Sequence, residues 1–288
     1  MPEPENAWSA SADARVIAVT NQKGGVGKTT TAINLSACLA SSGYKVLMVD
    51  MDPQGNATSG VGIEKAKISG CVYDLLLGDE DARSLLLPGP IEGMDVLPST
   101  LDLAAAEIEL ASEFSRENRL RSGLAPLLAS YDFIVIDCPP ALGLLTINSL
   151  AAAGETLIPI QCEYYALEGL VYLLRTIQRV KLHVNPDLII AGVLLTMSDT
   201  RTNLSKDVEA EVRREYPQMT FQTVIPRTVR LSEAPGFGQP IILYEPSSKG
   251  AWAYTELAKE VVNSGEERTG QRPGRVDRVG GGGGGEPA

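Results

Sequence analysis

The chain has 288 residues, of which 44% are hydrophobic and 21% are charged, and its formal net charge is −11 at pH 7. This composition fits a folded chain that is long enough for one large α/β domain with a sizeable core. The acidic balance argues against a general affinity for nucleic acid, so any DNA contact has to come from a local basic patch.

The sequence carries no signal for a membrane span, a secretory leader or a zinc site built from cysteines. No apolar run approaches the ~20 residues of a membrane span. Residues 1–14 lack a basic segment followed by an apolar one, so we expect no signal peptide and a cytoplasmic protein. The four cysteines, which we expect to be mostly small core residues, form no C-x-x-C pair and so do not indicate a zinc site. They are Cys38, Cys71, Cys138 and Cys162.

The first elements of the chain surround a glycine-rich loop. Residues 1–14 are polar and are predicted to be a disordered leader. A short β-branched strand at 16–20 then leads through glycines into an apolar helix from Lys28 to about Ser41. A strand, a glycine loop and a helix that opens on Lys-Thr-Thr are typical of a phosphate-binding loop.

The residue types of this loop suit a polyphosphate bound with Mg²⁺. Glycines let backbone N–H groups approach phosphates where a Cβ would block them, and the helix dipole adds to the positive field. We expect Lys28 to reach the β- and γ-phosphates and the Thr29 hydroxyl to ligate Mg²⁺. A glycine turn needed for packing alone would not require Gly-Lys-Thr-Thr. The predicted nucleotide-binding residues are Gly24, Gly25, Val26, Gly27, Lys28, Thr29 and Thr30.

The loop departs from the ordinary G-x-x-x-x-G-K-[ST] pattern at its start. Gln22 stands where that pattern has glycine, and a second lysine, Lys23, follows it. A lysine at the start of the loop cannot easily curl back onto its own γ-phosphate. We therefore expect Lys23 to point at something else.

Two carboxylates follow the next predicted strand, the apolar run at 45–50. Asp50 and Asp52 are two residues apart, so they project on one side if the strand continues that far. Asp52 lies further out, and strand ends beside a phosphate loop are where open α/β sheets bind ligands. An alternative remains open for Asp52, because aspartate before Pro53 is also common as a turn-capping residue.

A third strand end carries another carboxylate. The apolar run 133–136 ends in Asp137, as in Walker-B-like strands whose aspartate holds the water shell of Mg²⁺. Asp137 is therefore the predicted metal residue, acting through water. The Cys138-Pro139-Pro140 segment bends the chain away and is a candidate for a loop that senses the γ-phosphate.

The remaining segments alternate between helical and extended patterns. They predict one α/β domain over residues 15–263, with a mostly parallel twisted sheet flanked by helices on both faces. The mixed-charge, glycine-rich residues 264–288 are predicted to be a disordered tail. The expected helices are 72–77, 82–87, 101–114, 118–129, 146–153, one ending near 184, one ending near 216, and 251–262; the expected strands are 94–98, 156–161, 188–196 and 221–225.

Four separated segments together resemble the ParA/MinD family of ATPases, and most closely its chromosomal ParA (Soj-like) branch. This resemblance covers about residues 16–262 and implies a single-domain P-loop NTPase and a Mg²⁺-dependent ATP hydrolase with weak basal activity. The segments are Lys-Gly-Gly-Val-Gly-Lys-Thr-Thr at 23–30, Asp-Pro-Gln-Gly-Asn-Ala-Thr at 52–58, Ile-Asp-Cys-Pro-Pro at 136–140, and Ile-Pro-Arg-Thr-Val-Arg-Leu-Ser-Glu-Ala-Pro at 225–235.

The resemblance also implies roles for individual residues. In that family the first lysine of the deviant loop crosses a dimer interface, so Lys23 would act in trans much as an arginine finger does. Asp52 would position or activate the attacking water, which makes Lys23, Lys28 and Asp52 the predicted catalytic residues. Pro226 and Arg227 would contribute to adenine recognition.

The same resemblance implies partners. In that branch ATP makes a sandwich dimer that binds double-stranded DNA without sequence preference, and a centromere-bound partner, ParB, stimulates hydrolysis and releases the dimer. The protein would then be nucleoid-associated, with no membrane role. A solvated helix face with both signs of charge, including Glu209 and Glu211, is the alternative for the basic residues. The DNA-contact residues implied are Arg201, Arg213, Arg214, Arg230 and Lys249.

Three other functions are weighed against this one. A MinD-like membrane ATPase needs a C-terminal amphipathic helix, whereas this C-terminus is glycine and mixed charge. A relative of the nitrogenase iron protein needs cysteines that ligate iron at a dimer axis, and only Cys138 and Cys162 could be offered. A non-catalytic, nucleotide-gated DNA-binding scaffold would differ from the ATPase in showing no effect of Asp52→Ala on turnover.

Overall fold

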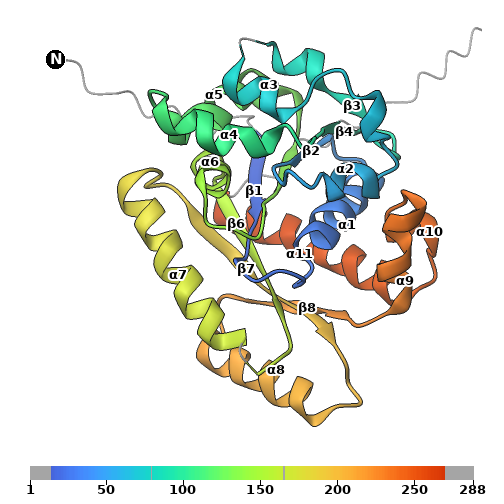
Figure 1. Cartoon of the computed structure of the whole chain (residues 1–288). Helices are drawn as coiled ribbons and strands as arrows, with labels where there is room; N and C mark the ends of the chain where they lie inside the picture. The colour runs from blue at the N-terminus through green and yellow to red at the C-terminus, as the bar shows by residue number, and fades with distance from the viewer. Residues whose placement is uncertain (1–13, 79, 165, 270–288) are drawn as a thin grey trace, which may run out of the picture.

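The described residues fold around one eight-stranded sheet. The computed structural model describes residues 14–269 except 79 and 165 (Figure 1). The strand order is β3-β4-β2-β5-β1-β6-β7-β8, and every neighbouring pair is parallel except β3 with β4. The strands are β1 (Arg15–Val19), β2 (Val46–Asp50), β3 (Leu87–Pro88), β4 (Met94–Leu97), β5 (Phe133–Asp137), β6 (Glu155–Gln161), β7 (Ile189–Ser198) and β8 (Thr220–Pro226).

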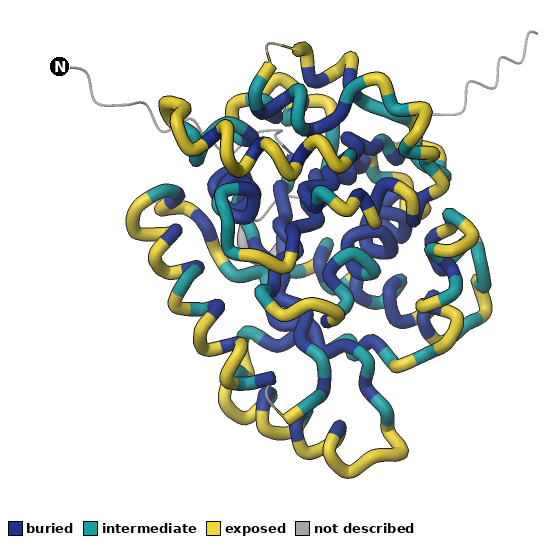
Figure 2. The backbone as a smooth tube through the Cα atoms, in the orientation of Figure 1, coloured by how far each residue is buried: buried dark blue, intermediate teal, exposed yellow. Residues whose placement is uncertain are grey.

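The central strands β1, β2 and β5 are buried on both faces, which explains their continuous apolar sequences. Along β1, Val16 and Ala18 belong to one core, whereas Ile17 and Val19 belong to the other. This alternation follows from the two-residue period of a strand. Figure 2 shows the central strands and α1 buried and the outer turns of α7 and α8 exposed. The sheet therefore forms the middle layer between two layers of helices.

The helices divide between the two faces of the sheet. Residues of α1 and α11 pack in the core of one face, and residues of α3 to α8 pack in the core of the other. The helices are α1 (Lys28–Ser41), α2 (Asn56–Gly60), α3 (Val72–Leu77), α4 (Leu103–Glu109), α5 (Arg119–Leu124), α6 (Leu144–Ala152), α7 (Ala166–His183), α8 (Asn203–Glu215), α9 (Val229–Glu233), α10 (Ile241–Tyr244) and α11 (Lys249–Thr269).

Three expected helices are shorter than predicted. The segment 82–87 contains only a 3₁₀ turn, Ala82–Leu85, and Leu87 begins β3. The segment 101–114 contains α4 followed by a 3₁₀ turn, and 118–129 contains α5 followed by another 3₁₀ turn. Pro126 stands in the first turn of the 3₁₀ segment after α5, where its missing N–H removes a helical hydrogen bond. The two-residue strand β3 has too little sequence pattern to be predicted and is an edge strand of the sheet.

The predicted domain boundaries need correction at both ends. Ala14, assigned to the disordered leader, is buried, and its N–H donates to the carbonyl of Leu128 at 3.0 Å. Helix α11 continues to Thr269, past the predicted tail start at 264. The rest of the predicted leader (1–13) and tail (270–288) lies outside the described residues. In the part of the chain that the structure describes, no helix has the length and apolarity needed to cross a bilayer.

Arg15 ties the start of the sheet to the end of α11. Its Nε and Nη2 donate to Glu155 of β6 at 2.8 and 2.9 Å, and its Nη1 donates to the carbonyl of Val261 at 2.7 Å. The guanidinium also lies over the ring of Phe133, and a Cβ added at Gly265 would collide with it. These contacts explain why α11 extends beyond its predicted end.

Replacing Arg15 with alanine is expected to lower the free energy of unfolding by about 3 kcal/mol, because a largely buried carboxylate loses its cation. Chemical denaturation of the two proteins measures this difference. The double variant with Arg15→Met and Glu155→Gln should recover part of the loss, since no unpaired charge remains. Equal unfolding free energies for wild type and Arg15→Ala would show that the pair does not stabilise the fold.

Candidate functional site

The predicted site residues converge at one edge of the sheet. In the parallel register, Val19 of β1 and Asp50 of β2 both pair with Asp137 of β5. The phosphate loop begins directly after β1, so the loop and both carboxylates lie at the carboxyl ends of neighbouring strands. Strand β1 lies between β5 and β6. The strands that follow it in the chain, β2 to β5, lie on one side of it, and β6 to β8 lie on the other. This is where open α/β sheets bind ligands.

The loop requires glycine at two positions because of its backbone conformation. Gly25 has φ of 75° and Gly27, the N-cap of α1, has φ of 90°. Asn21, which the sequence did not single out, holds the start of the loop. Its Nδ2 donates to the carbonyl of Pro159 at 2.7 Å, and its Oδ1 accepts from the N–H of Lys23 at 3.0 Å. The loop is thus fixed to β6 before it turns into the helix.

Lys28 lies inside this loop. It is only 6% exposed, and its Nζ donates to the carbonyl of Lys23 at 3.0 Å. Burial lowers the pKa of this amine, and the nearby Asp137 and Asp52 oppose the shift. Lys28 is therefore a desolvated cation with carboxylates around it, as expected for a group that binds phosphate.

Asp137 fits the predicted metal role. Its side chain is completely buried, and among the described residues neither carboxylate oxygen has a hydrogen bond of ordinary geometry. Burial and repulsion from Asp50 raise its pKa well above the usual range, while the Thr29 hydroxyl and Lys28 oppose that rise. Acceptor oxygens without donors suit a hydrated Mg²⁺, which prefers oxygen ligands and keeps several of its waters.

Asp50 and Asp52 have different surroundings. Asp50 is fully buried and accepts hydrogen bonds from the Thr58 N–H and hydroxyl at 2.8 and 2.7 Å and from the Asp52 N–H at 3.1 Å. Burial raises its pKa to about 6. These three bonds assign Asp50 to the structure of the loop between β2 and α2. The side chain of Asp52 takes no part in these three bonds.

The turn-capping alternative for Asp52 is realised in part. Its Oδ1 accepts from the Gln54 N–H at 2.9 Å, and its carbonyl accepts from the Gly55 N–H at 2.8 Å. Asp52 therefore stabilises the turn at Pro53 with one carboxylate oxygen. The other carboxylate oxygen, Oδ2, takes no part in this capping bond.

Lys23 points toward the end of β6. Its Nζ forms an ion pair with Glu163 at 2.9 Å, and the two side chains are 46% and 47% exposed. Glu163 also accepts from Gln161 at 2.6 Å. Glu163 was not among the predicted site residues, because it stands in a loop beyond a strand and no spacing pairs it with Lys23. This contact joins the phosphate loop to the segment that follows β6.

Strand β7 supplies a contact that the sequence analysis missed. The Thr196 hydroxyl lies 2.8 Å from the carbonyl of Val26 in the loop and 3.0 Å from the carbonyl of Ile160. A polar residue near the carboxyl end of a buried strand is the signal that could have identified it. The predicted adenine segment lies next to this strand end, because the N–H of Arg227 donates to the carbonyl of Ser198 at 2.9 Å.

The five basic residues implied in DNA binding differ in their surroundings. Arg213 is committed to the fold, since its guanidinium bonds Glu209 and the carbonyls of Phe221 and Gln222, each at 3.1 Å. The other three arginines are more exposed and each lies in an ion pair: Arg201 with Asp199, Arg214 with Glu211 and Glu215, and Arg230 with Glu233. Lys249 is exposed and begins α11.

A family model described as an AAA domain matches residues 14–190. The sporulation initiation inhibitor protein Soj of Bacillus subtilis (strain 168) is 58% identical over 251 residues, which are 87% of this chain and 99% of Soj. The chain belongs to the Soj/ParA family. A second member, the chromosome partitioning protein ParA of Myxococcus xanthus, is 54% identical over 258 residues, 90% of each chain.

A solved structure confirms the fold class of this Soj/ParA-family chain. The crystal structure of cobyrinic acid a,c-diamide synthase from Mycobacterium smegmatis with bound ADP and magnesium is 40% identical. Its TM-score is 0.77, and the match covers 90% of this chain and 98% of that one. The predicted P-loop NTPase fold, with a mostly parallel sheet between helices, is confirmed.

The cysteines have no metal-site geometry in the residues described here. All four are buried and free, as expected for core residues. Burial raises the pKa of Cys162 to about 11, which keeps this thiol protonated. In the same part of the chain, no group of three or more His, Cys, Asp or Glu side chains is arranged to hold a metal ion.

Proposed function

We propose that ATP assembles two copies of this chain into a sandwich dimer and that the dimer binds double-stranded DNA without sequence preference. A ParB-like centromere-binding protein then stimulates hydrolysis and releases the dimer, so the protein is associated with the nucleoid. The chain itself is an ATP hydrolase that uses ATP and Mg²⁺. Its membership of the Soj/ParA family supports this proposal, since several of its relatives are named chromosome partitioning proteins.

The residues of the site have complementary roles in this reaction. The loop amides at the start of α1 and the Lys28 ammonium bind the phosphates, with Lys28 exchanging the Lys23 carbonyl for phosphate oxygens. Thr29 and the water shell at Asp137 hold Mg²⁺, which neutralises phosphate charge when it is bound. Asp52 orients the attacking water. Pro226 and Arg227, beside the end of β7, bind the adenine.

One observation carries the dimer proposal. Lys23 stands at the rim of the loop, half exposed, with its ammonium on Glu163. A surface ion pair of this kind has little net stability. Its ammonium is therefore available to exchange Glu163 for the polyphosphate of a second copy, where it would neutralise charge that develops during phosphoryl transfer.

Lys23→Ala is expected to leave ATP binding within about twofold of wild type and to remove both ATP-dependent dimerisation and stimulated turnover. The reason is that only the trans contact, and no contact to its own nucleotide, is lost. Light scattering with Mg-ATP measures the mass, and phosphate release with DNA and a ParB-like protein measures turnover.

Lys67→Ala is the matched control, because Lys67 is also an exposed lysine in an ion pair, with Glu64 at 2.8 Å. This variant should dimerise and hydrolyse ATP as wild type does. A Lys23→Ala protein that still forms dimers with stimulated turnover would refute the trans role.

A further inference from the structure

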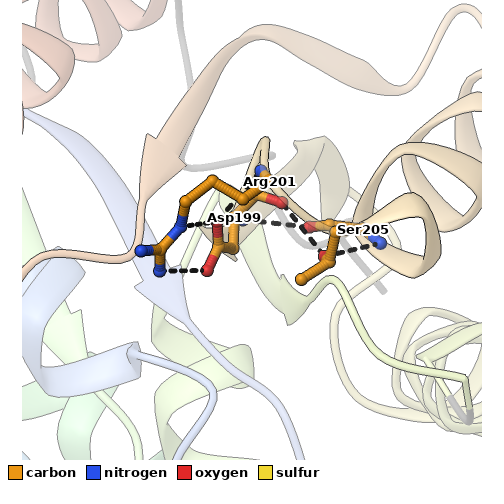
Figure 3. Close-up of polar contacts among 4 residues, drawn as sticks. Asp199, Arg201 and Ser205 are labelled. Atoms are coloured by element: carbon orange, nitrogen blue, oxygen red, sulfur yellow. Dashed lines mark hydrogen bonds and ion pairs between the residues drawn. The ribbon is translucent and has the colours of Figure 1, made fainter.

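The loop between β7 and α8 contains a bidentate ion pair on the protein surface. The Arg201 guanidinium faces the Asp199 carboxylate with two parallel hydrogen bonds, Nε to Oδ1 at 2.9 Å and Nη2 to Oδ2 at 2.7 Å (Figure 3). For the ion pairs of Arg213, Arg214 and Arg230, each carboxylate contact is made through one guanidinium nitrogen. Asp199 therefore occupies the two guanidinium nitrogens, Nε and Nη2, with which Arg201 could bind another oxyanion through two parallel hydrogen bonds.

The backbone fixes the Asp199 carboxylate, while Arg201 extends into solvent. The Asp199 N–H donates to the Ser205 hydroxyl at 3.1 Å, and Asp199 Oδ1 also accepts from the backbone N–H of Arg201 at 3.1 Å (Figure 3). Thr202 closes the turn by donating its N–H and its hydroxyl to the Asp199 carbonyl, both at 3.0 Å. The Asp199 side chain is 21% exposed and that of Arg201 is 86% exposed. The carboxylate is thus a fixed part of the turn, and the guanidinium is the movable partner.

A carboxylate and a phosphate present the same pair of oxygens to a guanidinium fork. We propose that Asp199 competes with a DNA phosphate for Arg201, and so holds the DNA affinity of each copy below what its basic residues alone would provide. This inference rests on the proposed function and names a residue that tunes it. The neighbouring Arg201 lowers the pKa of Asp199 to about 2, so the competitor stays ionised at neutral pH.

The competition has a consequence for the ATP dimer. A single copy whose exposed Arg201 is already paired makes few phosphate contacts, and non-specific affinity is the sum of such contacts. Two copies held together present two patches, and the second patch binds at a high effective concentration. By weakening the DNA contact of a single copy, Asp199 makes DNA binding depend more strongly on ATP-dependent dimer formation.

Asp199→Asn tests this directly, because asparagine keeps an oxygen for the Arg201 N–H and removes the charge. We expect the variant with Mg-ATP to bind a labelled random-sequence duplex roughly 3- to 10-fold more tightly, measured by fluorescence anisotropy. The slope of log affinity against log salt should steepen by about 1 per copy, since Arg201 then acts as a full counter-charge. A merely structural role for Asp199 would not change this slope.

Two controls isolate the effect. Glu64→Gln removes one negative charge from another exposed ion pair, on a different part of the chain, and should leave DNA affinity and slope unchanged. In an Arg201→Ala background, Asp199→Asn should raise DNA affinity by less than about twofold, because the arginine for which Asp199 competes with DNA is absent. Asp199→Ser, which also keeps an acceptor for the turn, replaces Asp199→Asn if thermal melting shows that the asparagine variant is misfolded.

Each outcome separates this inference from the proposed function. If wild type with Mg-ATP does not bind DNA, the proposed function fails and this inference fails with it. If wild type binds DNA through Arg201 but the Asp199 variants bind no more tightly, only this inference is overturned. It is also overturned if the gain persists without Arg201, or if Arg201→Ala leaves DNA affinity unchanged.

Discussion

Lys28→Ala is expected to weaken nucleotide binding by roughly 100-fold or more. Each charge-assisted hydrogen bond to a phosphate contributes on the order of 2 kcal/mol, and under the proposed function Lys28 contacts both the β- and the γ-phosphate. Isothermal titration with ATP and Mg²⁺ measures the loss. Hydrolysis and every nucleotide-dependent property should be lost with it.

The nucleotide-free stability of Lys28 variants provides the control. Burial lowers the pKa of Lys28, which means that the folded site disfavours its charged form. Lys28→Met keeps the apolar stem and removes the charge, so it should unfold at a temperature no lower than wild type. A Met variant that still bound ATP with wild-type affinity would remove Lys28 from the phosphate site.

Asp52→Asn is expected to lower the rate of ATP hydrolysis by roughly 100-fold or more while ATP still binds. Asparagine keeps an oxygen for the Gln54 N–H, so the turn at Pro53 survives and only the carboxylate chemistry is lost. Single-turnover phosphate release measures hydrolysis, and titration with a non-hydrolysable ATP analogue measures binding. Under the proposed function, this variant should also accumulate on DNA as an ATP dimer.

Asp52→Ala, compared with Asp52→Asn, separates the two roles of this residue. If the turn alone mattered, Asp52→Asn would hydrolyse ATP normally and only Asp52→Ala would fail. If the carboxylate positions the attacking water, the rate of ATP hydrolysis falls to the same extent in both variants. Normal hydrolysis by both would assign the water to another group. Basal turnover that is negligible in wild type and unchanged in both variants would favour the non-catalytic, nucleotide-gated scaffold.

The parts of the site that are local in sequence were predictable. The phosphate loop, with Lys28 and Thr29, follows from a strand, a glycine turn and a helix that are contiguous in the chain. The strand ends at Asp50 and Asp137 follow from apolar runs that stop at a carboxylate. Parallel strands bring such ends to one edge whatever the details of packing, so these residues meet there.

The partners of those residues were not predictable in the same way. Nothing in the spacing of Asp50 and Asp52 says which one takes three hydrogen bonds from Thr58 and the backbone. The contact between Lys23 and Glu163 joins residues 140 positions apart, and that between Thr196 and Val26 joins residues 170 apart. The family resemblance also grouped Arg213 with the other basic residues, although its guanidinium ties α8 to β8.

The amino-acid sequence by itself determined the α/β class, the nucleotide loop and the strand ends that face it, because each depends on periodicity or on a contiguous motif. Only the tertiary structure decided which carboxylate is structural, where the Lys23 ammonium lies, how far α11 extends and which arginine is committed to the fold. These features depend on hydrogen bonds and ion pairs between segments that are distant in the sequence. A polar side chain forms such a contact only when folding removes water from it and brings the partner group within hydrogen-bond distance.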